Sequence, residues 1–467
     1  MSVGFTAADA LNWTAGRLAG GSAADRFEGV GIDARTIEPG QLFVAIRGEH
    51  HDAHGFVDDA VTAGASGLLV EESWLASNSA PENTCTLAVP DSTAALGALA
   101  RGHRDRFKGP VVAVTGSNGK TTTKELIHSI LSVSGPCLRN PGNFNNEFGL
   151  PLSLLARRDE DERIVVELGM NHRGEIARLA AIARPDVGVI TNVGSAHIEF
   201  LGSQEQIAEE KGDLVASLGV DGVAVLNHDD PLAMSQARRI KGALRTFGRG
   251  PGADVRAESV RPQKDDHYSF RLVAPEGRAE VRVRGLAETT VINALAASAA
   301  ALVAGADLES TARGLELFKG VKGRMVKRTT LGGANLVDDT YNANPQSMQT
   351  ALESLVNLKA NGRSIAILGD MGELGDASER AHRQLGRLSA ELGIDELFVL
   401  GEDARWIAEE ALASGMAPGS VHVEEEHEAI GQSVEQIAGP GDWILVKGSR
   451  AMKMERLVEI LASEEKN

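Results

Sequence analysis

A glycine-containing stretch, Thr115-Gly-Ser-Asn-Gly-Lys-Thr-Thr-Thr, has the residue types that bind phosphate groups. It follows the β-branched run Val111–Val114 and precedes a helical pattern of apolar residues, so it joins a predicted strand to a predicted helix. Glycines allow the backbone to approach a phosphate closely, Lys120 can donate to the β- and γ-phosphates, and the Thr121 hydroxyl can bind Mg²⁺. The usual pattern has a glycine where this chain has Val114, so the loop is a shortened variant. Its context predicts nucleotide binding, supported by the helix N-terminus.

Three further side chains could act beside the phosphates. Glu167 ends the apolar run Ile164–Leu168, and a carboxylate at the carboxyl end of a buried strand favours a Mg²⁺ site or, alternatively, points into solvent. His197 follows the run Val187–Val193 and is, on spacing alone, either a metal-site residue or a structural histidine. Lys211 lies among acids late in a helical stretch, where the residues alone favour a solvated surface charge.

The elements that position these residues alternate between strand and helix. In the middle of the chain the buried-strand candidates are Val111–Val114, Ile164–Leu168, Val187–Val193 and Val223–Leu226. Strands alternating with helices predict a parallel sheet with helices on both faces. The alternating segments Tyr268–Val273 and Ala279–Val283 indicate a small antiparallel insertion.

Similar patterns occur on both sides of this region. Short extended runs among Ala-rich helical stretches occupy the first hundred residues, and a polar, basic connector follows at 101–110. After a linker that begins at Lys319, a second strand-and-helix alternation has the strand candidates Asn335–Asp338, Ser364–Leu368, Leu397–Leu400 and Trp443–Val446. We therefore expect three α/β domains, near residues 1–107, 108–319 and 320–467.

Composition excludes several classes of protein. The 467 residues include 47 Lys and Arg against 65 Asp and Glu, and a net charge of −18 argues against a nucleic-acid partner. Two cysteines are too few for a disulfide framework and indicate a reducing compartment. The first residues do not resemble a secretory signal, and the apolar runs are too short or too broken for membrane insertion. We expect a soluble cytoplasmic protein.

The motifs resemble those of the Mur ligases, the ATP-dependent amide ligases that build the peptidoglycan stem peptide. The phosphate loop is similar to theirs, and the central-domain signatures are Asn143-Phe-Asn-Asn-Glu-Phe-Gly-Leu-Pro-Leu, Glu167-Leu-Gly-Met-Asn, Asn192-Val-Gly-Ser-Ala-His197 and Asn227-His-Asp-Asp-Pro231. Three later motifs resemble the members that attach D-alanyl-D-alanine: Asp339-Thr-Tyr-Asn-Ala-Asn-Pro-Gln-Ser-Met348, Gly369-Asp-Met-Gly-Glu-Leu-Gly375 and Lys447-Gly-Ser-Arg450. The resemblance spans nearly the whole chain. It implies a P-loop ATPase-like central domain between an α/β N-terminal substrate domain and a Rossmann-like C-terminal domain.

The resemblance also implies a nucleotide site and a metal site. Residues expected to bind ATP are Gly116, Ser117, Asn118, Gly119, Lys120, Thr121, Thr122, Asn293, Arg324 and Asp339. Thr121, Glu167, His197 and Lys211 would serve Mg²⁺ ions, and Lys120 would act in catalysis with the last three. Lys211 matches a lysine that the family carries as a carbamate, and this change reverses the charge so that the side chain attracts Mg²⁺. Carbamylation requires a neutral amine, so the site must lower the pKa of the lysine.

Substrate contacts carry over with two departures. The residues that match are Asp33, Arg35, Asn145, Asn146, Asn342, Lys447 and Arg450. Asp33 and Arg35 would hold the UDP end, although Ala34 replaces the usual serine between them. Thr289-Thr290 replaces the usual His-Asn pair before Asn293, so only Asn293 remains as an adenine-side contact.

The implied reaction joins D-alanyl-D-alanine to UDP-N-acetylmuramoyl-tripeptide through an acyl phosphate, in a monomer. The alternatives are a sibling Mur ligase or folate polyglutamylating enzyme with another acceptor, and a nucleotide-gated binding protein that has lost ligation. Tyr341-Asn-Ala-Asn-Pro argues against the first, and an intact set of Glu167, His197 and Lys211 argues against the second.

Overall fold

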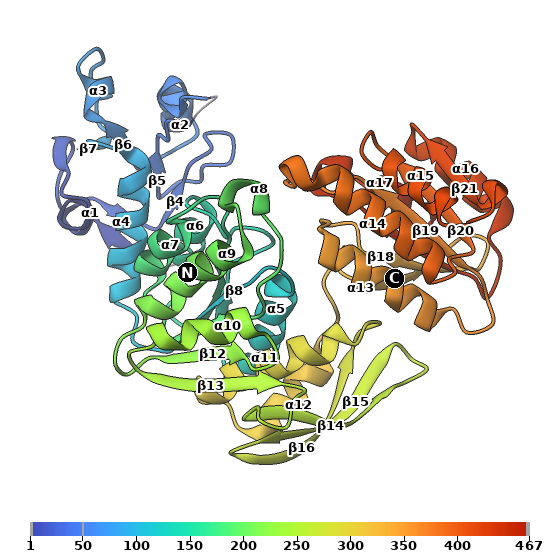
Figure 1. The fold of residues 1–467 in the computed structure, drawn as a ribbon. Helices are drawn as coiled ribbons and strands as arrows, with labels where there is room; N and C mark the ends of the chain where they lie inside the picture. The colour runs from blue at the N-terminus through green and yellow to red at the C-terminus, as the bar shows by residue number, and fades with distance from the viewer. Residues whose placement is uncertain (1–2, 49–50, 464–467) are drawn as a thin grey trace.

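The computed structural model describes residues 3–48 and 51–463. Three main sheets follow one another along the chain, and helices cover them (Figure 1). This mixed α/β architecture, with a largely parallel central sheet, confirms the predicted fold class. Among the described residues, no helix combines the length and the apolar character that crossing a membrane requires.

The first sheet has five strands in the order β2-β7-β6-β5-β4. Its strands are β2 (Arg17–Gly20), β4 (Gly29–Gly31), β5 (Gln41–Val44), β6 (Gly67–Glu71) and β7 (Cys85–Val89). β2 is antiparallel to β7, and the other neighbours are parallel. A separate antiparallel pair consists of β1 (Phe5–Thr6) and β3 (Arg26–Phe27). The helices are α1 (Ala7–Thr14), α2 (Val57–Thr62), α3 (Glu72–Leu75) and α4 (Ser92–Asp105).

The central sheet has nine strands in the order β16-β15-β14-β13-β12-β11-β8-β10-β9. They are β8 (Val111–Thr115), β9 (Cys137–Arg139), β10 (Arg163–Glu167), β11 (Val187–Ile190), β12 (Val223–Asn227), β13 (Ala243–Gly248), β14 (Val255–Pro262), β15 (His267–Ala274) and β16 (Gly277–Arg284). The helices of this region are α5 (Lys120–Leu131), α6 (Gly149–Leu155), α7 (Glu175–Ala183), α8 (Ile198–Leu201), α9 (Gln204–Ser217), α10 (Pro231–Ser235), α11 (Thr289–Val303) and α12 (Leu308–Leu317).

The third sheet has six strands in the order β17-β18-β22-β19-β20-β21. They are β17 (Val326–Thr329), β18 (Asn335–Asp338), β19 (Ser364–Gly369), β20 (Glu396–Leu400), β21 (Val421–Glu424) and β22 (Trp443–Lys447). All neighbours are parallel except β17, which is antiparallel to β18. The helices are α13 (Pro345–Leu358), α14 (Ser378–Glu391), α15 (Arg405–Ala413), α16 (His427–Ile437) and α17 (Glu455–Leu461), and a short 3₁₀ turn, η3 (Gly375–Ala377), follows β19.

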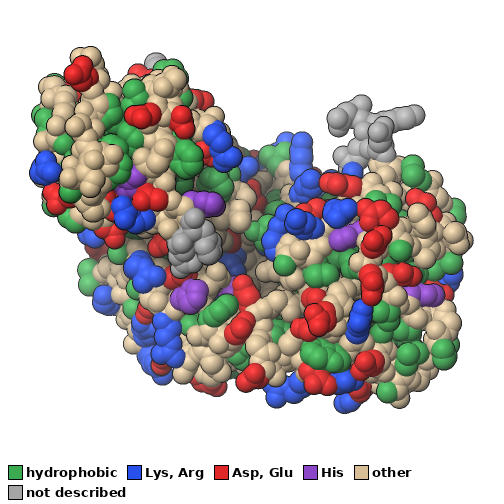
Figure 2. Space-filling model, turned by 90° about the horizontal axis from the view of Figure 1, so that it is seen from above, with side chains coloured by type: hydrophobic (Ala, Val, Ile, Leu, Met, Phe, Trp, Pro, Cys, Tyr) green, Lys and Arg blue, Asp and Glu red, His purple; other side chains and the backbone are tan. Residues whose placement is uncertain are grey.

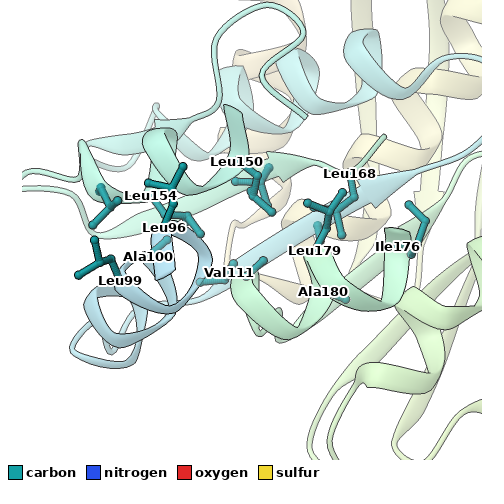
Figure 3. Close-up of a cluster of buried hydrophobic side chains, with 14 of the residues drawn as sticks. Leu96, Leu99, Ala100, Val111, Leu150, Leu154, Leu168, Ile176, Leu179 and Ala180 are labelled. Carbon is teal, nitrogen blue, oxygen red and sulfur yellow. The ribbon is translucent and has the colours of Figure 1, made fainter. Parts of the chain in front are cut away.

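The two faces of the central sheet belong to different cores, because successive side chains of a strand point to opposite faces. In β8, Val111 and Ala113 pack in the core that includes α4, α6 and α7 (Figure 3), whereas Val112 and Val114 pack in the core that includes α5 and α11. All four side chains are fully buried. This burial on both faces explains why the strand is a continuous β-branched run rather than an alternating one.

One prediction about the organisation of the chain is wrong, and a second is incomplete. The polar connector expected at 101–110 begins only after Asp105, since 101–105 form the last turns of α4. α4 packs against α6 and α7, and Arg104 donates to the carbonyl oxygens of Ala183 at 2.9 Å and Arg184 at 2.8 Å. The polar side chains of this segment therefore join the first region to the central one.

The predicted antiparallel insertion is part of the central sheet. β15 and β16 pair antiparallel, as expected, but β14 connects them to the parallel strands. Only two residue pairs, Phe247 with Val255 and Gly248 with Arg256, align β13 with β14. Half-exposed strands of mixed polarity such as β14 leave a weak sequence pattern, which is why the link was not predicted.

Candidate active site

The phosphate loop lies between β8 and α5 and depends on both of its glycines. Gly116 has φ 150° and Gly119 has φ 79°, a backbone region that disfavours residues with a Cβ atom. A Cβ at Gly116 would overlap Thr191 Oγ1, and one at Gly119 would overlap Asn293 Oδ1. The loop therefore packs closely against the end of β11 and against α11.

The loop that follows β11 holds the phosphate loop in place. The Asn118 N–H donates to Asn192 Oδ1 at 2.9 Å, and the Asn118 carbonyl accepts from Thr191 Oγ1 at 2.6 Å. The Gly194 N–H donates to Ser117 Oγ at 2.7 Å. These bonds fix the loop before any ligand binds, and the sequence analysis did not assign Thr191 this role.

Lys120 lies at the start of α5, where its ammonium is held by its own loop. Nζ donates to the carbonyl oxygens of Gly116 at 2.9 Å and Ser117 at 3.4 Å. Burial lowers the pKa of Lys120, and the negative charge of Glu167 opposes that effect. The ammonium is thus available at the mouth of the loop for a phosphate oxygen.

Glu167 ends β10 as a buried carboxylate with one unsatisfied oxygen. Oε1 accepts from Asn145 Nδ2 at 2.7 Å, while Oε2 has no hydrogen-bond partner among the described residues. The side chain of Asn140 holds the backbone of Glu167 at both its N–H, at 2.9 Å, and its carbonyl, at 3.0 Å. Lys124, fully buried beneath, donates to the Asn140 carbonyl at 2.7 Å. A buried carboxylate oxygen left without a donor suits a cation.

His197 contacts a residue from the far end of the chain. Its Nδ1 lies 2.5 Å from Glu373 Oε2, in the loop between β19 and η3, in an ion-pair contact that lacks hydrogen-bond geometry. This interaction lowers the pKa of Glu373. The sequence analysis singled out His197 but not Glu373, which it included only within the Gly369–Gly375 motif.

The third sheet contributes a buried ion pair. Lys447, at the end of β22, donates from Nζ to Asp339 Oδ2 at 2.6 Å and to the Asn342 carbonyl at 3.0 Å. Burial lowers the pKa of Lys447, and the charge of Asp339 opposes the shift. The Arg324 guanidinium lies 3.9 Å from the centre of the Tyr341 ring, a cation–π contact. Asp339 was expected near ATP and Lys447 near the acceptor substrate, and in this structure the two side chains form an ion pair.

A cavity of about 640 Å³ connects these groups. Figure 2 shows the molecule hollowed between its two sides, with Lys and Arg side chains on both sides of the hollow. The predicted site residues that line the cavity are Ser117, Asn118, Gly119, Lys120, Thr121, Thr122, Asn145, Glu167, His197, Asn293, Arg324, Asp339, Asn342, Lys447 and Arg450. Thr289 and Thr290, which begin α11, line it as well.

Contacts across the cavity bring the central and third sheets together. Asn118 of the phosphate loop accepts from Asn344 Nδ2 at 2.8 Å and donates to Gln346 Oε1 at 2.9 Å. Both partners lie at the start of α13. The arrangement therefore links the loop that would bind phosphates directly to the third region of the chain.

Lys211 lies outside the lining, in α9, and is only 1% exposed. The structure thus overturns the surface-charge interpretation that the residues alone favoured. Within residues 3–48 and 51–463 its side chain forms no hydrogen bond or ion pair, and its neighbour Glu210 instead accepts from the N–H groups of Gly174 and Ile176 at the start of α7. Burial, with a contribution from the charge of Lys120, lowers the pKa of Lys211 well below its usual value.

Four other predicted residues do not line the cavity. Gly116 is buried beneath the loop, and Asn146 Oδ1 accepts from the N–H of Gly149 at 2.9 Å and so caps α6. Asp33 and Arg35 form an exposed ion pair of 2.6 Å in the first region, and this pair lowers the pKa of Asp33 to about 2. In the described part of the chain no cluster of three or more His, Cys, Asp and Glu side chains is arranged to bind a metal ion.

Comparisons with known proteins agree with this geometry. Three family models match the chain: "Mur ligase family, catalytic domain" at residues 26–104, "Mur ligase middle domain" at 114–301, and "Mur ligase, glutamate ligase domain" at 323–450. The UDP-N-acetylmuramoyl-tripeptide–D-alanyl-D-alanine ligase of Bacillus subtilis is 37% identical over 433 residues, 93% of each chain. Its counterpart in Escherichia coli is 35% identical over 438 residues, again 93% of each chain.

Solved structures show the same similarity. A crystal structure of MurF from Acinetobacter baumannii has a TM-score of 0.88 and 33% identity, covering 98% of both chains. The MurF ligase of Thermotoga maritima, solved in complex with ADP, has a TM-score of 0.81 and 31% identity over 92% of this chain and 96% of that one.

Proposed function

The chain belongs to the Mur ligase family, and we propose that it is the ATP-dependent ligase that joins D-alanyl-D-alanine to UDP-N-acetylmuramoyl-tripeptide. The product is UDP-N-acetylmuramoyl-pentapeptide, a precursor of peptidoglycan. The single observation that carries this proposal is similarity to ligases of this activity over 93% of both chains. The cavity between the phosphate loop and the third sheet is consistent with such a reaction.

The reaction requires activation of a carboxylate, because joining it to an amine in water is unfavourable. In our proposal the γ-phosphoryl group of ATP is transferred to the terminal carboxylate of the tripeptide, forming an acyl phosphate and ADP. The amine of D-alanyl-D-alanine then attacks the acyl carbon, and the tetrahedral intermediate collapses to the amide with loss of phosphate. Phosphoryl transfer of this kind depends mainly on positioning and charge neutralisation, to which Lys120 and the loop N–H groups would contribute.

The residues at the loop fit a magnesium site. Glu167 Oε2 is buried without a hydrogen-bond donor, which a bound cation would compensate. We assign Thr121, Glu167 and His197 as the protein groups nearest to Mg²⁺, completed by phosphate oxygens, since Mg²⁺ is usually bound through few protein ligands. When bound, Mg²⁺ would neutralise the charge that develops on the transferred phosphoryl group.

Lys211 fits the expected carbamate. The side chain is buried without a partner in the described structure, and its lowered pKa leaves the amine neutral more readily. A neutral amine attacks the carbon of CO₂, a C–N bond forms and one proton is released, leaving an anion. The nearby charge of Lys120, which disfavours an ammonium at this position, would stabilise that anion.

The remaining residues divide between the two substrates and the nucleotide. We propose that Arg324, Asp339 and Asn293 face the nucleoside part of ATP, and that Asn145 lies near the tripeptide. We propose that Asn342, Lys447 and Arg450 face the carboxylate of D-alanyl-D-alanine. In this structure Lys447 is paired with Asp339 and Arg450 with Glu455. Asn146, as a helix cap, is proposed to shape the substrate-side loop rather than to bind substrate.

The division into domains follows from these roles. Residues 1–107 would bind the UDP end through Asp33 and Arg35, residues 108–319 would bind ATP, and residues 320–467 would bind the amine substrate. We propose a cytoplasmic monomer, since ATP is the phosphoryl donor and Cys85 and Cys137 are both free and buried.

One experiment tests this function. The purified protein is incubated with ATP, Mg²⁺ and UDP-N-acetylmuramoyl-tripeptide, with D-alanyl-D-alanine present, absent, or replaced by single amino acids. We expect a pentapeptide product by mass spectrometry only with the dipeptide. Ligation of glutamate or of a diamino acid would identify a sibling ligase, and ATP cleavage that ignores every acceptor would identify a nucleotide-gated binding protein.

A further inference from the structure

Glu373 is an acidic side chain that no motif argument assigned to the reaction, and it enters the cavity from the third region. It lies in the loop between β19 and η3 and lines the cavity together with Lys120 and Glu167. Its Oε2 lies 2.5 Å from Nδ1 of His197. The two residues come from different sheets, so the contact exists only when the central and third regions are docked.

The backbone on both sides of this contact is unusual. His197 has φ 65° and Glu373 has φ 62°, values that residues with a Cβ atom seldom adopt. Such conformations are strained, and strained residues cluster at functional sites.

The loop that contains Glu373 is also docked by steric fit. A Cβ at Gly375, where φ is 51°, would lie 3.1 Å from Glu199 Cγ in α8, the helix that begins just after His197. Ile198 packs partly in the core of the third region as well as in that of the central one. The position of Glu373 relative to His197 is therefore set by several contacts and not by the ion pair alone.

We propose that Glu373 is a positioning residue that acts through His197, and this inference rests on the proposed function of the cavity. From its position 2.5 Å from Nδ1, the carboxylate favours a proton on that nitrogen, restrains the ring orientation of His197 and leaves the lone pair of Nε2 for a metal ion. Histidines that bind metals characteristically donate their second N–H to a carboxylate or a carbonyl. Here the carboxylate belongs to another domain, so docking of the third region completes the metal side of the site.

The test measures Mn²⁺ binding by electron paramagnetic resonance, with the full chain, a non-hydrolysable ATP analogue and UDP-N-acetylmuramoyl-tripeptide. Removal of such a partner typically weakens metal binding 10- to 100-fold. We expect that loss for Glu373→Ala and a smaller one for Glu373→Gln, which keeps an acceptor oxygen. In a His197→Ala background, itself weakened, Glu373→Ala should change binding less than twofold. Equal losses in both backgrounds, or no loss in His197→Ala itself, would overturn the proposal.

Asp376→Asn is the matched control, because Asp376 lies three residues after Glu373 in η3, is exposed and forms no ion pair or hydrogen bond within the described structure. Asp376→Asn should leave Mn²⁺ binding unchanged. If it weakens Mn²⁺ binding as much as Glu373→Ala does, the effect of Glu373 is due only to the loss of a negative charge in this region. Small-angle scattering should give one radius of gyration for wild type, Glu373→Ala and Asp376→Asn. A larger radius of gyration for Glu373→Ala would show that the residue holds the central and third regions together. That result would contradict a positioning role.

These measurements are independent of product formation. A wild-type protein that makes no pentapeptide would contradict the proposed function, even if the coupling between His197 and Glu373 is observed. A protein that makes pentapeptide but shows no coupling would contradict only the inference about Glu373.

Discussion

Replacing Lys211 with methionine should stabilise the protein and abolish ligation. The lysine is 1% exposed and its amine forms no hydrogen bond or ion pair in the described structure, so burial penalises the charged ammonium. An unpaired buried amine costs about 1–3 kcal/mol, and methionine has a similar shape without that group. A gain of this size corresponds to a rise of roughly 2–12 °C in the melting temperature of a unit of 150–250 residues.

The pH dependence gives a second signature of Lys211. Because the folded state lowers its pKa below the usual 10.5, the unfolded chain binds more protons in the interval between the folded pKa and 10.5. The free energy of unfolding contributed by this group therefore rises with pH through that interval. The stabilising effect of Lys211→Met should accordingly be largest below the pKa that Lys211 has in the folded state, and it should decline as the pH rises toward 10.5.

The effect of bicarbonate on the melting temperature distinguishes a carbamylated Lys211 from a buried amine that is not modified. In CO₂-free buffer Lys211→Met should melt above wild type. Added bicarbonate should raise the melting temperature of wild type only, by about 1.4 kcal/mol in free energy of unfolding when dissolved CO₂ is tenfold above its dissociation constant. The assay is thermal denaturation by circular dichroism with and without bicarbonate, and the control is Lys264→Met, an exposed lysine. A destabilised Lys211→Met protein, or an equal response of both proteins to bicarbonate, would refute this reasoning.

Three further predictions concern other residues of the central region. Asn140→Ala should remove both hydrogen bonds to the backbone of Glu167. We expect the free energy of unfolding in urea to fall by about 2–4 kcal/mol and kcat to fall by about 10- to 100-fold. An unchanged kcat would contradict the role of Asn140. Gly116→Ala should weaken ADP binding in calorimetry more than tenfold, because the new Cβ overlaps Thr191 Oγ1 at a φ of 150°; unaltered affinity would show that the loop adapts. Burial and the neighbouring guanidinium of Arg139 lower the pKa of His128 to about 4. The free energy of unfolding should therefore fall as the pH is lowered from 6.5 to 4, and His128→Gln should weaken this pH dependence.

The sequence was sufficient to predict those features that depend on local order. A β-branched run, two glycines and an amphipathic helix define the phosphate loop, and the structure has the strand β8 before it and the helix α5 after it, as predicted. The strands of the central and third sheets were predicted where their side chains are apolar on both faces. Strands with exposed or mixed faces, such as β13 and β14, were not predicted because their pattern resembles that of loops.

Tertiary packing decides what the sequence could not show. Acidic neighbours made Lys211 resemble a solvated charge, but Glu210 turns to the start of α7 and leaves the lysine buried. Asp339 and Lys447 matched separate motifs, and only the fold shows that they pair. The contact between His197 and Glu373 joins distant parts of the chain, and no spacing rule could have predicted it.

The central claim is that ATP activates the tripeptide as an acyl phosphate, and transfer of ¹⁸O tests it most directly. The terminal carboxylate of UDP-N-acetylmuramoyl-tripeptide is labelled with ¹⁸O, and the products of reaction with ATP and D-alanyl-D-alanine are analysed by mass spectrometry. We predict ADP, a pentapeptide that keeps one labelled oxygen in its new amide, and inorganic phosphate that contains the other. Unlabelled phosphate, or label in AMP, would contradict the proposed mechanism.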